Sequence, residues 1–270
     1  PAGIDLSADQ RPTIVGVLIA TWVLASLAVA LRFTARSIAK AGLWWDDWSS
    51  HSVVFLLLVN ACSSEHLCTD TQHGLGLHVW VAPADSVSTF LKALVIAELG
   101  YVATTVAIKF SILLSYRRVF RIPYVMHATA GVAVVVSAWA LACVLIVCLQ
   151  CIPLQGYWDK SIPAKCWVNS RDYFLGKSIP DTVTDLCILA IPLKPIWQLH
   201  TNRMQKVVLT LTFLVGGLVT VISIIRLVCL LRVDLSSEDI TWNFVPYLIW
   251  TCVELNVGTV AACLPCLRPL

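Results

Sequence analysis

The sequence contains few charged residues, and this shortage excludes most water-soluble folds. Of its 270 residues, 13% are charged and 58% are hydrophobic. A water-soluble domain usually has about a quarter of its residues charged. We therefore expect most of the chain to lie in a lipid bilayer.

Common catalytic and nucleotide-binding motifs are also absent. No GxGxxG, GxxxxGK[ST], HExxH or GxSxG string occurs, so nucleotide-dependent enzymes, zinc peptidases and standard hydrolases lose their usual support. The net charge is only +3, and no cluster of basic and aromatic residues suits a phosphate backbone. We expect no nucleic-acid partner.

Seven long apolar stretches are present instead. A hydrocarbon core of about 30 Å takes roughly 20 helical residues to cross. Because lipid cannot pair open backbone groups, stretches of this length predict α-helices. The expected spans are residues 13–33, 48–67, 89–116, 125–150, 177–199, 207–231 and 244–267. The predicted fold is an all-α, polytopic bundle of seven transmembrane helices, with the lipid bilayer as its environment.

The positions of lysine and arginine predict the orientation of the bundle. The first, third and fifth connections are basic, whereas the second, residues 68–88, has no lysine or arginine. Basic loops favour the cytoplasmic side, which places the N-terminus outside and the C-terminus inside. The fourth connection, with Lys160 and Lys165, opposes this orientation, but reversing the chain would misplace three basic loops to correct one.

This orientation divides the chain into three parts. Residues 1–12 are expected to be a short extracellular segment, 13–267 the membrane domain and 268–270 the start of a cytoplasmic tail. The expected location is the plasma membrane or an endomembrane.

Cysteine residues near the predicted outer face of the membrane could form a disulfide bond. Cys151 and Cys166 flank a short segment of the fourth connection, and a bond between them would contribute about 3 kcal/mol by loop closure. Spacing alone does not fix connectivity, so Cys68 with Cys166, or three free thiols, are the alternatives. Cys151 with Cys166 is the pairing that we predict.

The second connection holds possible metal ligands, among them Cys68, His73 and His78. Their spacing matches no compact zinc or copper site, so no metal site is predicted. Gly74 and Gly76 indicate a turn instead, with the histidines hydrogen-bonded inside an extracellular cap.

Ionisable residues inside the spans are the candidate functional groups, because lipid makes them costly unless they are paired or face a cavity. Asp181 and Asp185 are four residues apart and share a helix face with Lys177. We expect such polar faces to converge on the bundle axis, in the outer half of the membrane. The candidate catalytic residues are Asp181, Asp185, Glu254 and Arg226, and the candidate ligand-binding residues are Glu98, Asp185, Arg226, Trp250 and Glu254.

A purely structural role for these groups is the alternative. Arg226 would then neutralise Asp185 or Glu254 and join helices, while Lys109 would extend to the inner headgroups. Acids outnumber the deep arginine, so one carboxyl would be protonated in a shared pocket of low dielectric constant. Pro192 is expected to kink the fifth span.

A series of short motifs resembles the fungal rhodopsin-like domain. They include residues 45–48 (WDDW), 73–80 (HGLGLHVW), 109–120 (KFSILLSYRRVF), 223–227 (SIIRL) and 253–258 (VELNVG). The resemblance covers residues 31–270 and implies a seven-helix integral membrane protein of filamentous fungi. Pth-type receptor-like proteins and membrane proteins encoded beside secondary-metabolite genes, such as the satratoxin-cluster type, belong to this family.

The resemblance to this family does not imply that the protein binds a retinal chromophore. A retinal Schiff base needs a lysine amine, normally on the last helix, and residues 244–267 contain no lysine. We expect no retinal and no other cofactor.

Two functional hypotheses lead. The first is a receptor-like protein that binds a small lipophilic ligand and signals to a cytoplasmic partner through its basic loops. The second is a membrane-embedded isomerase or cyclase that acts on a lipid-soluble secondary-metabolite intermediate, with a carboxyl as acid or base and Arg226 stabilising anionic charge. A small-solute transporter is a third hypothesis, although no repeated halves support it.

Overall fold

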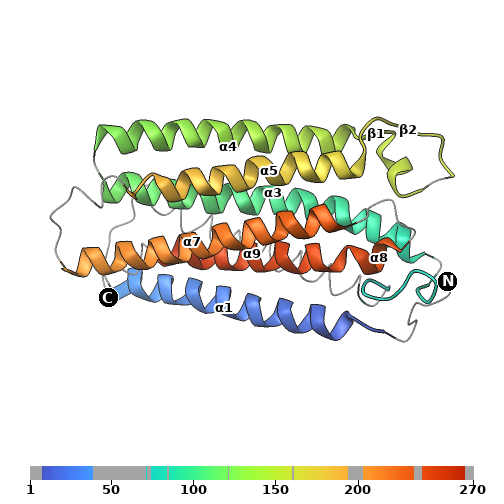
Figure 1. Cartoon of the computed structure of the whole chain (residues 1–270), viewed down its shortest axis with the longest axis horizontal. Helices are drawn as coiled ribbons and strands as arrows, with labels where there is room; N and C mark the ends of the chain where they lie inside the picture. Colours follow the sequence, from blue (N-terminus) through green and yellow to red (C-terminus); the bar gives the residue numbers. More distant parts are fainter. Residues whose placement is uncertain are drawn as a thin grey trace.

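Long helices lie side by side in an elongated bundle in the computed structural model (Figure 1). The structure describes residues 8–38, 71, 74–83, 85–120, 122–159, 161–193, 203–233 and 239–264. The helices are α1 (Arg11–Ile38), α3 (Ser86–Val119), α4 (Pro123–Leu149), α5 (Ser170–Ala190), α7 (Arg203–Arg232), the short α8 (Ile240–Asn243) and α9 (Val245–Cys263).

The all-α membrane fold predicted from the sequence is confirmed. Within the described residues, five helical segments are long and apolar enough to cross a membrane. They are Arg11–Arg32, Ser86–Val119, Pro123–Leu149, Thr210–Arg232 and Ile240–Cys263. The predicted second span, residues 48–67, lies outside the described residues, so seven helices and the orientation stay predictions.

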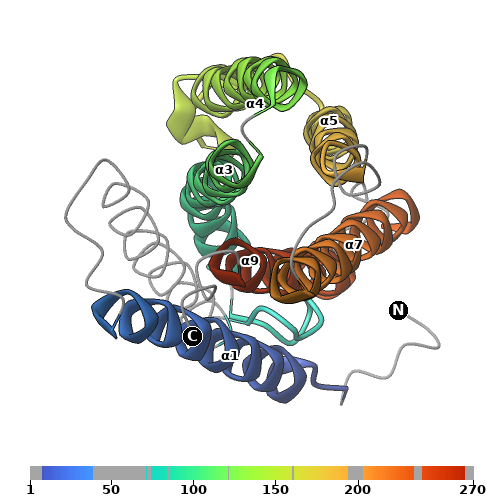
Figure 2. The ribbon, with the colours of Figure 1, turned by 90° about the vertical axis from the view of Figure 1, so that its left-hand side faces the viewer.

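Five helices form a ring when the bundle is viewed from its end. Figure 2 shows α3, α4, α5, α7 and α9 around a common axis, with α1 outside the ring beside α9. Arg32 Nη1 in α1 donates to Ala262 O at 2.9 Å, and Asn256 Nδ2 in α9 donates to Thr21 Oγ1 at 3.0 Å. These polar contacts fix α1 against α9.

Helix α5 begins earlier than the sequence predicts and also ends earlier. Asn169 caps its N-terminus by accepting from the backbone N–H of Arg171, and the helix ends at Ala190. The expected span, residues 177–199, began only after the polar first turns of this helix. Pro192 lies in a two-residue turn that follows α5, Leu193 is helical again, and the residues after it lie outside the described ranges, so the kink at Pro192 stays a prediction. Pro180 lies inside α5.

A small hairpin joins α4 to α5. Strand β1 (Cys151–Ile152) pairs antiparallel with β2 (Lys165–Cys166), and the 3-10 helix η1 (Leu154–Tyr157) lies between them. The predicted Cys151–Cys166 disulfide is confirmed. We call the end of the bundle that carries this structure the hairpin end, and the opposite end the α3–α4 end, after the helices that connect there.

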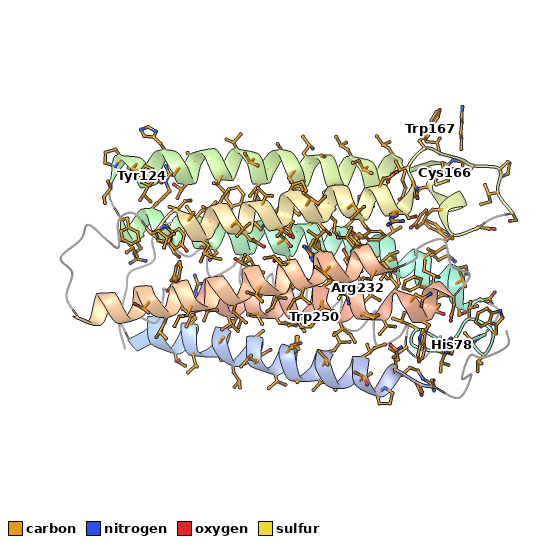
Figure 3. All side chains as sticks on the ribbon, viewed as in Figure 1. His78, Tyr124, Cys166, Trp167, Arg232 and Trp250 are labelled. Atoms are coloured by element: carbon orange, nitrogen blue, oxygen red, sulfur yellow. A yellow bond between two sulfur atoms is a disulfide. The ribbon has the colours of Figure 1, made fainter. Side chains whose placement is uncertain are left out.

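Aromatic side chains mark both ends of the bundle. Trp167 extends from the hairpin end and Tyr124 lies at the α3–α4 end (Figure 3), and both are exposed. Helix α4 between them has 27 residues, about 40 Å at 1.5 Å per residue. This length matches a bilayer with its interfacial regions, where tyrosine and tryptophan are enriched.

A cap of hydrogen bonds closes the hairpin end. His78 Nδ1 lies 2.5 Å from Asp239 Oδ2, Val79 N donates to Asp239 Oδ1 at 2.9 Å, and the His78 ring stacks on Trp242. Gly74 has a positive φ of 111°, which suits the predicted turn. The expected hydrogen bonding is confirmed for His78, and His73 lies outside the described residues.

Aromatic packing fills the bundle interior below this cap. Phe244 lies at its centre, with ring-centroid distances of 6.0 Å to Phe90, 5.2 Å to Phe174 and 4.9 Å to Tyr247. All four side chains are buried. Among the described residues, the hairpin half of the bundle therefore contains a closely packed aromatic core.

Candidate functional site

The polar faces of four helices meet on the bundle axis. On α3, Glu98, Tyr101 and Lys109 follow helical spacing, so they lie on one side of the helix. Helices α5, α7 and α9 add their own acidic, basic and hydroxyl groups at the same level. We call the following residues the polar cluster: Tyr101, Lys109, Asp181, Asp185, Ser223, Arg226 and Glu254.

Asp181 is the centre of the polar cluster. Its Oδ1 lies 2.7 Å from Lys109 Nζ, and its Oδ2 lies 2.6 Å from Arg226 Nη2. Tyr101 donates to Asp181 Oδ2 at 2.5 Å and accepts from Arg226 Nη1. One carboxylate thus joins cations from α3 and α7, and it is itself only 1% exposed.

Lys109 is bound inside the bundle and does not extend to the headgroups. Its Nζ donates to Thr184 Oγ1 at 2.6 Å and to the backbone oxygen of Asp181 at 2.9 Å, and it lies 3.0 Å from Asp185 Oδ1. The side chain is buried. The expectation that Lys109 reaches the inner headgroups is therefore wrong, because partners on α5 lie within its reach.

Ser223 links the two remaining acids. Its Oγ lies 2.8 Å from Asp185 Oδ2 and also forms a hydrogen bond with Glu254 Oε1. Glu254 Oε2 lies 2.8 Å from Arg226 Nη1. Arg226 therefore pairs with Asp181 and Glu254, while Asp185 pairs with Lys109. The three acids and two cations form one continuous network across α3, α5, α7 and α9.

A second, simpler pair lies nearer the hairpin end. Lys177 forms an ion pair with Glu98, and Tyr173 donates to Glu98 Oε2 at 3.0 Å. Trp139 Nε1 donates to the backbone oxygen of Lys177 at 3.0 Å. The Lys177 ammonium also lies 4.0 Å from the ring centroid of Tyr101. This pair contains one acid and one base and is buried among aromatic residues.

A pocket lies beside the polar cluster, toward the α3–α4 end. It has a volume of about 640 Å³, including the part that is open to the outside. Its walls come from α3, α5, α7 and α9. The apolar wall includes Ile108, Ile112, Tyr116, Ile188, Leu189 and Leu255, and the polar end includes Thr105, Lys109, Asp181, Asp185 and Glu254.

The pocket differs in position from the sequence-based expectation. Lys109 and Glu254 lie at the polar end of the pocket. Residues that follow them in α3 and α9 form its walls, so the pocket extends away from the hairpin end. In the predicted orientation this is the inner half of the membrane. The outer half is occupied by the aromatic packing around Phe244, which counting residues along single helices did not reveal.

The predicted site residues divide into two groups. The structure brings Asp181, Asp185, Arg226 and Glu254 together. Glu98 belongs to the neighbouring ion pair, and Trp250 (labelled in Figure 3) is half-buried, outside the pocket lining.

Sequence reasoning missed Tyr101, which touches both Asp181 and Arg226. Its spacing of three residues from Glu98 and eight from Lys109 places it on the same helix stripe, and this was the available signal.

The three acids are close enough to suggest a metal site. Oxygen atoms of Asp181, Asp185 and Glu254 lie within 4.8 Å of one another. Carboxylate oxygens are ligands for hard cations. In the described residues, however, Lys109 and Arg226 already contact these carboxylates, so side chains supply positive charge at this position.

Comparisons with known proteins agree with the motif resemblance. The family described as fungal rhodopsin domain matches residues 31–270. A polyenoic acids biosynthesis gene cluster protein of Metarhizium anisopliae is 30% identical over 265 residues, covering 90% of this chain and 69% of that protein. Receptor GIN3 of Arthrobotrys oligospora is 27% identical, covering 96% of this chain and 62% of the receptor.

A satratoxin biosynthesis cluster protein of Stachybotrys chartarum is also similar, at 22% identity over 60% of this chain and 59% of that protein. The chain thus spans about two thirds of the length of these relatives. No solved structure matches the chain significantly. The expected family resemblance is confirmed.

Proposed function

Because this chain belongs to the fungal rhodopsin domain family, we propose that it is a receptor-like membrane protein that binds a small lipophilic molecule. The binding site is the pocket between α3, α5, α7 and α9. A relative carries the name Receptor GIN3, which supports a sensing role. No retinal is expected in this site.

The observation that carries the proposal is the composition of the pocket. One end is polar, with Asp185 and Glu254, and the remaining walls are mostly isoleucine, leucine and other apolar side chains. Ligand sites of small molecules typically combine an apolar lining with a few placed polar groups. A lipid-soluble molecule with one polar group matches this division.

Binding at this position would act directly on the packing of two helices. The pocket is lined by Leu189 of α5 and by Thr212, Gly216 and Val219 of α7. A ligand there lies between α5 and α7 and favours the spacing of these helices that fits it. A ligand changes a conformational equilibrium by binding one state better than another, so this contact supplies a route to a signalling partner.

Gly216 and Gly217 provide a matched pair for testing the pocket. A Cβ at Gly216 would meet only Leu189 Cδ1, at 3.3 Å, so Gly216→Leu directs a side chain into the pocket. A Cβ at Gly217 would meet nothing within 4 Å. Transcript levels are compared between strains with and without this gene. We expect Gly216→Leu to abolish the difference that the gene makes, and Gly217→Leu to preserve it.

A membrane-embedded isomerase or cyclase is the second candidate. The observation in its favour is the pair of carboxyl groups, Asp185 and Glu254, which are joined through Ser223 and line the pocket. Such a pair can hold and return a proton during a reaction. Relatives named as biosynthesis cluster proteins also support it.

Metabolite profiles separate the two candidates. Strains with the gene, without it and with Glu254→Gln are compared by mass spectrometry and by transcript levels, with membrane levels of the protein verified. Unchanged intermediates with altered transcription support the receptor. Accumulation of one defined intermediate in both the deletion and the Glu254→Gln strain would reject the receptor in favour of the enzyme.

A further inference from the structure

The charge balance of the polar cluster restricts the class of ligand. When all groups are ionised, three carboxylates (Asp181, Asp185 and Glu254) face two cations (Lys109 and Arg226). Within the described residues, the cluster therefore lacks one positive charge. Two of these acids, Asp185 and Glu254, line the pocket.

Ser223 indicates how the cluster meets this shortage. Its hydroxyl lies at hydrogen-bond distance from oxygens of both Asp185 and Glu254. A hydroxyl group has a single proton to donate. Ser223 Oγ also lies 3.1 Å from the backbone oxygen of Val219, so one proton faces three acceptors. For both carboxyl contacts to be hydrogen bonds, at least one carboxyl must be protonated and donate to Ser223 Oγ. In this arrangement an extra proton takes the place of the missing positive charge.

Thr105 provides an independent sign that a polar group binds here. Its side chain lines the pocket and is 6% exposed, and its Oγ1 has no hydrogen-bond partner among the described residues. The neighbouring Thr104 shows the usual alternative, because its Oγ1 donates to Gly100 O at 2.8 Å. A buried hydroxyl without a partner is unfavourable, and a ligand group in the pocket would satisfy Thr105.

We propose that the ligand is a lipophilic amine. Its ammonium group takes the place of the proton shared by Asp185 and Glu254 and donates to Thr105 Oγ1, while its hydrocarbon part lies against the apolar walls. The ammonium cation enters and one carboxyl proton leaves to water, so total charge is conserved and no electrons are transferred. A carboxylate ligand would bring further negative charge to a cluster in which acids already outnumber cations. This inference rests on the proposed binding function of the pocket.

Three probes of equal chain length test the proposal: octylamine, octanol and octanoate. Their binding to the full chain in phosphatidylcholine nanodiscs is measured by equilibrium dialysis at pH 7, with empty nanodiscs as the background. We expect octylamine to bind at least about tenfold more tightly than octanol, which corresponds to about 1.4 kcal/mol, and octanoate to bind most weakly. A pH indicator should report about one proton released per bound amine, by the exchange described above.

Charge variants identify the groups responsible. Glu254→Gln and Asp185→Asn should each remove the preference for octylamine over octanol. Asp159→Asn, in the hairpin, removes the same charge away from the pocket and should retain it. Melting temperatures identify folded variants, and either pocket variant is sufficient if the other fails to fold.

The outcomes separate this inference from the proposed function. If octanol or octanoate binds as well as octylamine, and Gly216→Leu blocks that binding, the amine proposal is overturned while the binding function stands. If octylamine binds without proton release, or keeps its preference in the folded charge variants, the amine proposal is also overturned. If no probe binds above the empty nanodiscs, both proposals are overturned.

Discussion

The two halves of the bundle bury ionisable groups in different ways. Near the hairpin end, Glu98 and Lys177 form a one-to-one pair among aromatic side chains. Toward the α3–α4 end, the polar cluster has one more acid than base and borders a pocket. Both arrangements overcome the cost of charge in lipid, but only the second contains a group that a ligand can neutralise.

This difference helps to separate structural from functional charge. A balanced buried pair holds helices together and loses stability when one partner is removed. A cluster with a surplus acid loses little when that acid becomes neutral. Stability and binding measurements on equivalent substitutions in the two halves therefore test the distinction directly.

The largest expected effect is that of Glu98→Gln. This substitution removes the carboxylate that pairs with Lys177. The Lys177 side chain is almost completely buried, so water cannot take the place of the lost counter-charge. We expect a loss of about 3–5 kcal/mol in the free energy of unfolding, or failure to fold. The equivalent change in the other half, Glu254→Gln, should cost less than about 1 kcal/mol, as measured by thermal unfolding in nanodiscs.

The double variant Glu98→Gln/Lys177→Met serves as the control. Removing both charges should restore most of the lost stability, since a hydrophobic replacement of a buried pair is often neutral. Equal destabilisation by Glu98→Gln and Glu254→Gln would contradict the proposed difference between the two halves.

The next effect concerns the disulfide at the hairpin end. Cys151→Ser/Cys166→Ser opens the loop of 15-residue separation, which by the loop-closure estimate lowers the free energy of unfolding by about 3 kcal/mol. Because the hairpin lies away from the pocket, ligand binding should be unchanged. Mass spectrometry without reduction should detect the linked peptide in the parent protein. A change in ligand affinity in the double serine variant would show that the two halves of the bundle are coupled.

A moderate effect is expected for Asp181→Asn. Acids and cations of the cluster then balance without an extra proton, as they do in Glu254→Gln, but Asp181 contacts Lys109, Arg226 and Tyr101. Hydrogen bonds to charged groups contribute about 1.5–3 kcal/mol, and we expect a loss of about that size in thermal unfolding. If Asp181→Asn and Glu254→Gln have equal stability, charge count alone governs the cluster.

The smallest effect on stability is expected for Gly216→Leu and Gly217→Leu. Leucine is favoured over glycine within a helix by about 1 kcal/mol in aqueous hosts, so both variants should fold. Only Gly216→Leu places its side chain in the pocket, so it alone should weaken octylamine binding. Equal binding by the two variants would place the ligand elsewhere.

Much of the fold follows from local sequence properties. Long apolar stretches predicted α1, α3, α4, α7 and α9 to within a few residues at most ends. Helix α5 was predicted less well, because Asp172, Lys177 and Asp181 lie within it and reduce its apparent hydrophobicity. These side chains are tolerated in the helix through partners on other helices, which a reading of one stretch does not reveal.

The candidate site was predicted only in part, because helical spacing shows which side chains share a helix face but does not show which helices they contact. Helical spacing identified Asp181, Asp185, Arg226 and Glu254, because polar residues of a membrane helix face the bundle interior. Spacing did not reveal that Lys109 reaches α5, or that Glu98 forms a separate pair with Lys177. These assignments depend on distances between helices, which the sequence of each helix does not contain.

The sequence by itself determined that this is a helical membrane protein with acids, an arginine and lysines on inward helix faces, since hydrophobicity and helical period are local properties. Only the tertiary structure decided which charges pair, that Lys109 joins Arg226 as a second cation of the cluster, and that the pocket beside the cluster lies toward the α3–α4 end. Pairing and free volume depend on how side chains from different helices pack together: the aromatic residues around Phe244 pack closely in the hairpin half, whereas the pocket lies toward the other end.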